Sequence, residues 1–130
     1  MEKTKVVSPK VLQPTAPFSQ AITARGHTFM FISGQVALDA QGNLVGKGDV
    51  RAQLKQIFEN IKALLEARGA TLDQVVKLTT FLTDADFYPI FNEVRRESLK
   101  EVYPASTAVI VKGLVNKDWL AEVEAIAIVD

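Results

Sequence analysis

Residues 50–69, VRAQLKQIFENIKALLEARG, decide the fold, because they predict an amphipathic helix whose apolar side has to be covered. Apolar residues recur here at steps of three and four, which places them on one side of an α-helix. Asp49 stands at the N-cap position and Gly69 at the position just after the helix. An isolated helix of this length is marginal in water, so it must lie on an apolar surface made by the rest of the chain. The predicted stripe contains Val50, Leu54, Ile57, Phe58, Ile61, Leu64 and Leu65.

The composition is that of one ordinary globular domain spanning residues 1–130. Fifteen basic residues balance fifteen acidic ones, so no net field draws the chain to nucleic acid or to an anionic membrane. The absence of cysteine and the single histidine exclude thiolate catalysis and sulfur- or histidine-rich metal sites, and we expect no metal. No apolar run has the length of a signal peptide or a membrane span, so we expect a cytoplasmic protein.

The remaining segments predict an α+β fold with a mixed sheet and two helices on one face. A second amphipathic helix follows the Asp84–Asp86 turn, with Arg95 and Arg96 expected on its outward side. Residues 21–25 and 28–36 predict a hairpin around Gly26. The sheet face away from the helices is left open, and a second copy of the chain can cover it. Strands are expected at 5–7, 21–25, 28–36, 75–83, 105–112 and 121–129.

Two strand features point to a site. Gly34 follows Ser33 inside a strand pattern, where glycine marks a bulge or a close approach by another group. In residues 121–129 the carboxylates Glu122 and Glu124 share one face with two isoleucines. Because unpartnered acids cannot be buried in a dry face, this face is expected to border a cleft or a subunit boundary.

Four segments in order resemble the Rid family, the reactive intermediate deaminases, over essentially the whole chain. The resemblance implies a chorismate-mutase-like fold that assembles as a homotrimer with a central barrel and sites in the clefts between subunits. It also implies hydrolysis of short-lived enamines and imines, small-molecule substrates, to a carbonyl product and ammonia without a cofactor. The segments are APFSQA at 16–21, FISGQVALD at 31–39, VVKLTTFLTDADFYPIFNEV at 75–94 and AEVEAIA at 121–127.

The resemblance assigns roles to individual residues. Glu122 matches the acid that activates the attacking water, and Ser33 matches a group that holds substrate or water beside it. Asn92 matches a further position facing the cleft. Phe18 stands at the rim, where the family usually has tyrosine. We therefore predict Glu122 as the catalytic residue and the others as substrate-binding residues.

The chain departs from the family at the residue that anchors the substrate. The family pattern P-A-R-S carries an arginine that clamps the substrate carboxylate, and this chain has Ser106 in its place. A serine hydroxyl offers one neutral bond where arginine offers two charge-assisted ones. Two hypotheses stay open: a deaminase with altered or reduced activity, or a non-catalytic trimer that binds small metabolites or another protein. Arg25, Arg95 and Arg96 are candidates to replace the lost charge from a neighbouring subunit.

Overall fold

The computed structural model describes residues 1–130 as two layers, a sheet and a pair of helices. Its principal elements are β1 (Glu2–Val6), β2 (Ala21–Arg25), β3 (Thr28–Gln35), α1 (Val50–Glu66), β4 (Val75–Leu82), α2 (Tyr88–Ser98), β5 (Ala105–Ile110) and β6 (Ala121–Val129), with short 3₁₀ turns at Leu72–Gln74 and Ala85–Phe87.

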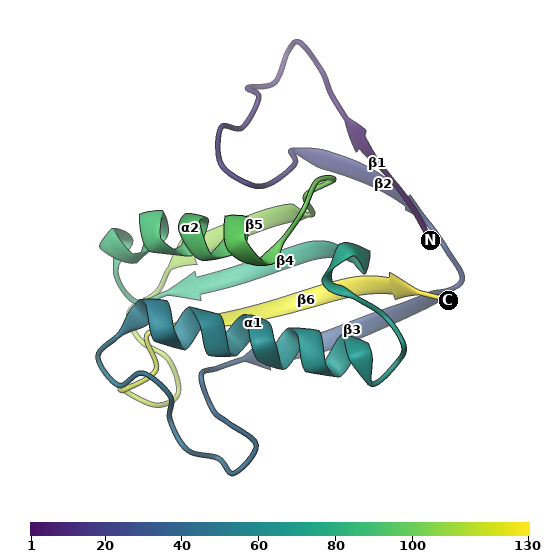
Figure 1. The fold of residues 1–130 in the computed structure, drawn as a ribbon. Coiled ribbons are helices and arrows are strands. Elements are labelled where there is room, and N and C mark those ends of the chain that lie inside the picture. Colours follow the sequence, from purple (N-terminus) through teal and green to yellow (C-terminus); the bar gives the residue numbers. More distant parts are fainter.

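The main sheet has four strands in the order β3-β6-β4-β5. β6 runs antiparallel to both of its neighbours, whereas β4 and β5 are parallel, so the sheet is mixed as predicted. Figure 1 shows α1 and α2 on the same face of this sheet, with α1 across β6 and β3 and α2 beside β5. The α+β class with two helices on one face is therefore confirmed. Neither helix combines the length and the apolarity that crossing a lipid bilayer requires.

The core lies between α1 and the helix-facing side of the sheet. Six of the seven predicted stripe residues are buried, and Leu64 is 40% exposed. The Asp49 side chain accepts a hydrogen bond from the Ala52 N–H, and Gly69 has φ +74°, so the predicted helix ends are confirmed. The alternation of β6 is also confirmed, because its alanines and valines face the core. They are Ala121, Val123, Ala125, Ala127 and Val129.

The predicted hairpin between residues 21–25 and 28–36 is wrong. β2 pairs with β1 in a separate two-stranded ribbon, and β3 pairs with β6. The chain passes from β2 to β3 without pairing the two, and Gly26 lies close to β6: an added Cβ would lie 2.3 Å from Cγ2 of Ile128. In Figure 1 the ribbon stands away from the main sheet, and the loop after β1 reaches the side of the molecule that holds α2 and β5.

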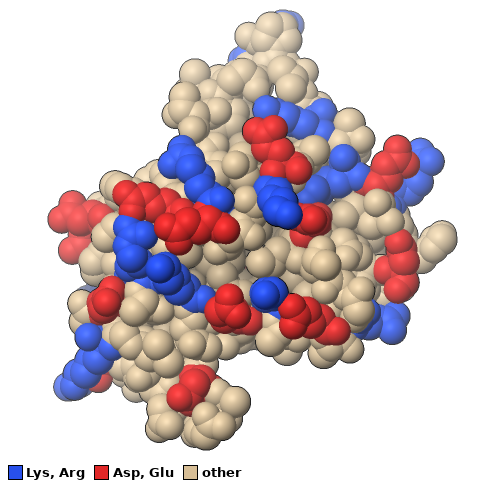
Figure 2. Space-filling view, in the orientation of Figure 1, with Lys and Arg blue, Asp and Glu red and all other residues tan.

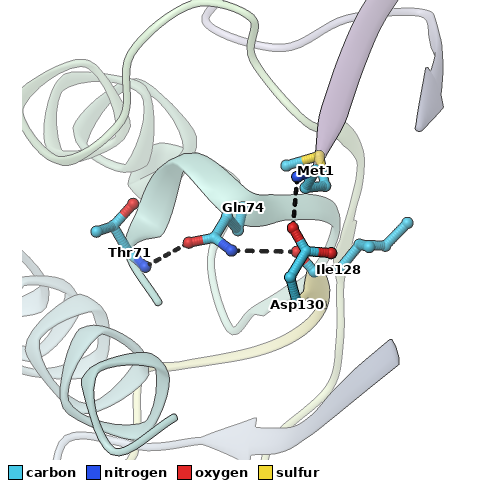
Figure 3. A network of polar contacts seen from close by, with 5 residues as sticks. All are labelled: Met1, Thr71, Gln74, Ile128 and Asp130. Carbon is cyan, nitrogen blue, oxygen red and sulfur yellow. Dashed lines mark hydrogen bonds and ion pairs between the residues drawn. The ribbon is translucent and has the colours of Figure 1, made fainter. Parts of the chain in front are cut away.

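Polar contacts tie β1 to the end of the main sheet. The Met1 ammonium donates to Asp130 Oδ2 at 2.6 Å, while nearby Gln74 bonds the Thr71 N–H and the Ile128 carbonyl (Figure 3). Lys3 Nζ donates to the backbone carbonyl of Asp73 at 2.7 Å. The start of β1 is thus held beside the C-terminal end of β6.

The second helix begins after the Asp84–Asp86 turn as predicted, but it ends at Ser98 and not at Tyr103–Pro104, where the sequence predicts its end. One prediction about its faces is also wrong. Arg95 was expected on the outward side and is instead 1% exposed. The physical reason is its position: Arg95 is one turn after Phe91, which is fully buried, and next to Val94, also fully buried. Its neighbour Arg96 is exposed, as expected.

Candidate active site

The structure divides the five predicted site residues between the two faces of the sheet. Phe18, Asn92 and Ser106 lie together on the face that carries the helices. Ser33 and Glu122 lie on strands β3 and β6 and turn to the open face.

Arg95 is the centre of the first group, which we call the Arg95 cluster: Phe18, Phe91, Asn92, Arg95 and Ser106. Its Nη1 donates to the Ser106 hydroxyl at 3.0 Å, and its Nη2 donates to the Asn92 side-chain oxygen. The guanidinium carbon lies 4.3 Å from the ring centroid of Phe91 and 5.6 Å from that of Phe18. Cations are attracted to ring faces at such distances. Three predicted substrate-binding positions therefore converge on one arginine of the same chain.

The Arg95 guanidinium is buried without a carboxylate partner. Its Nε is buried and has no hydrogen-bond partner, and none of the ion pairs in the structure includes this residue. Burial lowers the pKa of Arg95 from its ordinary value, with the nearby Tyr88 acting the other way. The cluster thus holds a desolvated cation with donors to spare.

Local backbone contacts bring Phe18 and Ser106 to this arginine. Ser19 bonds twice to the segment before β5, from its N–H to the Pro104 carbonyl at 3.1 Å and from its hydroxyl to the Tyr103 carbonyl at 2.7 Å. These bonds fix Phe18 next to β5. Ser106 pairs with Leu78, which is buried under the helices, so the register turns its hydroxyl toward α2.

On the open face, the Glu122 carboxylate lies directly over Gly34. A Cβ added to Gly34 would be 2.2 Å from Glu122 Oε2, so a larger residue at position 34 would displace the carboxylate from this place. The pairing of β3 with β6 shifts register between Ile32 and Gln35, which places Ser33 and Gly34 in a bulge. Both readings of Gly34 from the sequence, a bulge and a close approach, are confirmed. Ser33 is exposed beside this contact.

Within one chain, Glu122 and Ser106 cannot act on the same small molecule. Glu122 pairs with Phe81 of β4, and Ser106 pairs with Leu78, three residues earlier. Two strand spacings of ~4.8 Å and three residues of ~3.3 Å separate their backbones by roughly 14 Å, and their side chains lie on opposite faces. A site that uses both groups needs a second copy of the chain.

Arg95 is the residue that sequence reasoning placed wrongly, since it was considered only as a contribution from a neighbouring subunit. A signal was available in the sequence. Arg95 follows Phe91 by four residues and Asn92 by three, so helical periodicity puts it beside both. Its charge had suggested an outward position, and the periodicity of its neighbours was the better guide.

The surface and the acidic residues give no sign of a metal or polyanion site. No group of three or more His, Cys, Asp or Glu residues is arranged to hold a metal ion. Figure 2 shows acidic and basic side chains interspersed over the helix-bearing face, without a large patch of one sign. This face is therefore not shaped electrostatically for a nucleic-acid backbone.

Comparison with known proteins identifies the family. A RutC family protein of Pyrococcus abyssi is 42% identical over 98% of this chain and 98% of its own length. A protein of Dermatophagoides farinae named 2-iminobutanoate/2-iminopropanoate deaminase is 33% identical over all of both chains. Among solved structures, YyfB of Yersinia pestis, a Rid family protein of unknown function, matches with a TM-score of 0.86 and 30% identity, covering 99% of this chain and 100% of its own. Residues 8–129 also match the model of the family described as Endoribonuclease L-PSP, so the chain belongs to this family, the Rid family.

Proposed function

We propose that the protein is a Rid-type deaminase, which hydrolyses a reactive imine or enamine to a carbonyl compound and ammonia. The observation that carries this proposal is the Glu122 carboxylate, held over Gly34 on a sheet face that one chain leaves open. The relative from Dermatophagoides farinae, which is named for this chemistry, aligns over the whole chain and supports it.

The chemistry needs only a positioned base and protons. Water attacks the carbon of the protonated imine while the Glu122 carboxylate takes one of the water's protons, which leaves a neutral carbinolamine. Glu122 then returns that proton to the nitrogen. The carbon–nitrogen bond breaks as the hydroxyl oxygen forms the carbonyl, and the departing ammonia takes up the hydroxyl proton and leaves as ammonium. An enamine reaches the same path after protonation at carbon. Ser33, which is exposed next to Gly34, holds the water or the substrate in this proposal.

We propose that the active form is a homotrimer with sites in the clefts between subunits. Apolar side chains on the open face support an assembly, since Phe29 is 60%, Phe31 75% and Val109 40% exposed in the single chain. The division of the site residues between opposite faces also supports it, because neighbouring copies can bring the two groups together. Light scattering is expected to give three times the 14.3 kDa chain mass.

The test is hydrolysis of 2-iminobutanoate generated in the assay, with wild type compared with Glu122→Gln. We expect the variant to lose roughly 10²- to 10⁴-fold in rate, as is typical for removal of a general base, with trimer mass and thermal stability retained. An unchanged rate in a folded Glu122→Gln trimer would refute the role of Glu122. Failure of the wild type to release ammonia faster than the uncatalysed reaction would refute the deaminase assignment.

A non-catalytic trimer that binds a small metabolite or another protein is the second candidate. Ser106, in place of the arginine of the family pattern, is the observation that favours it. The same assay separates the two: tight binding of a product analogue without any acceleration of hydrolysis would identify a binding protein.

A further inference from the structure

We propose that Arg95, from helix α2, binds the carboxylate of the substrate and so replaces the arginine that the family pattern has at position 106. The inference rests on the proposed function and assigns one residue of this chain to the carboxylate of its substrate. In this chain the anchoring charge has moved from the strand to the facing helix.

No acidic side chain balances the charge of Arg95. A buried guanidinium is costly unless an anion pairs with it, and Arg95 is 1% exposed with no carboxylate partner. The acids of the same helix, Glu93 and Glu97, are paired with Arg51 instead. The buried Arg95 guanidinium is therefore available to form an ion pair with an anion that is not part of the chain.

Arg95 also has N–H groups that are not used in hydrogen bonds. A guanidinium carries five N–H groups in a planar fork. The terminal nitrogens of Arg95 donate to Ser106 and Asn92, and the Tyr88 side chain also interacts with the guanidinium. Nε has no partner. The Ser106 hydroxyl accepts from Arg95, so its own proton is free to donate to the same anion. The N–H groups of Arg95 and the hydroxyl of Ser106 can therefore donate to the same carboxylate.

A surface cavity lies beside the Arg95 cluster. The Phe18 ring lies 5.6 Å from the guanidinium carbon and also lines a cavity of about 200 Å³ on the surface. Lys5 and Arg96 line the same cavity and favour anions, with Glu101 opposing them. Phe18 is half-buried between cavity and cluster. Phe18 is thus the residue that this cavity and the Arg95 cluster share, and Arg95 itself does not line the cavity.

The experiment measures binding of 2-oxobutanoate, the stable keto acid product of 2-iminobutanoate, by isothermal titration calorimetry on the full-length assembled protein. Its neutral amide, 2-oxobutanamide, is the matched ligand. We expect wild type to prefer the acid, and Arg95→Gln to weaken acid binding by about 10- to 100-fold while leaving the amide unchanged, the loss typical of a charge-assisted pair. Arg51→Gln, on an exposed arginine that also contacts α2, is the control and is expected to bind like wild type.

A relocation variant tests whether position 106 and position 95 are interchangeable. In Arg95→Gln with Ser106→Arg, the guanidinium returns to the strand, and preference for the acid should return with it. If Arg95→Gln binds the acid as wild type does, the inference is wrong. If wild type shows no preference for the acid over the amide, it is also wrong, and this measurement needs no variant to fold. Preference for the acid without hydrolysis of the imine would retain the role of Arg95 and refute the deaminase.

Discussion

Two arginines contact helix α2, and they are treated in opposite ways. Arg51 reaches across from α1 and pairs with Glu93 and Glu97, with 40% of its side chain exposed. Arg95 belongs to α2 itself, is almost completely buried, and has only neutral partners. The exposed Arg51, whose charge water already screens, thus has two acidic partners. The buried Arg95, whose charge water does not screen, has none.

The difference teaches that the two arginines serve different ends. Exposed pairs such as Arg51 with its glutamates contribute at most about 1 kcal/mol and are dispensable. A buried cation without an anion lowers stability, and a folding requirement alone would favour an apolar residue at position 95. Residues that lower the stability of the folded state in this way are typical of functional sites. Substitutions at the buried arginine's partner, at the exposed arginine and at a second exposed ion pair should therefore have different effects.

Asn92→Asp should have the largest effect, because it gives Arg95 the counter-charge that Arg51 already has. The Asn92 oxygen accepts a hydrogen bond from Arg95, so a carboxylate in its place forms an ion pair without moving the backbone. We expect the free energy of unfolding to rise by about 1–3 kcal/mol, measured by urea denaturation. Affinity for 2-oxobutanoate should fall in the same variant, because the internal carboxylate competes for the guanidinium.

The control for Asn92→Asp is the same change in an Arg95→Gln background. There the stabilisation should disappear, which makes the gain a coupling between the two residues in a double-mutant cycle. An equal gain with and without Arg95 would mean that the buried cation is not short of an anion, and the contrast with Arg51 would lose its meaning.

Much of the fold was predictable because it depends on local periodicity. The stripe of α1, its capping residue Asp49 and the alternation of β6 all follow from the spacing of apolar residues along one element. The bulge at Gly34 was predictable for a related reason, since a glycine in a strand pattern has few other uses. The partners of strands were less predictable: β2 satisfies the β propensity of its sequence against β1 as well as it would against β3.

The sequence suggests which residues form the candidate site, but it does not contain their arrangement in space. Placing Ser106 and Glu122 on opposite faces requires the register of β4 against both β5 and β6, which no local pattern contains. Ser106 was expected to leave the substrate carboxylate without a positive partner. That expectation treated position 106 alone, whereas the packing of α2 on β5 brings Arg95 to the same point.

Arg51→Gln tests the exposed side of the contrast and should have a smaller effect. Its carboxylate partners lie in water, so we expect a loss of about 0.2–1 kcal/mol at low salt. The loss should shrink further near 1 M NaCl, where the Debye length is about 3 Å. Urea denaturation at two salt concentrations measures both. A loss above about 2 kcal/mol that persists in high salt would show that Arg51 is structurally essential, contrary to the role given to it here.

Asp130→Asn should have the smallest effect, and its pH dependence shows how an exposed pair differs from a buried one. The hydrogen bond from the Met1 ammonium holds the pKa of the Asp130 carboxyl below its ordinary value, although desolvation acts in the opposite direction. A lowered carboxyl pKa stabilises the folded state above the unfolded pKa of about 3.9, and this stabilisation is lost as the pH falls through the lower folded value. The melting temperature of wild type should therefore exceed that of Asp130→Asn slightly near neutral pH, and the two should converge in acid. A gap that stays constant down to about pH 2 would mean that the carboxylate charge contributes nothing and that the side chain acts only through its shape.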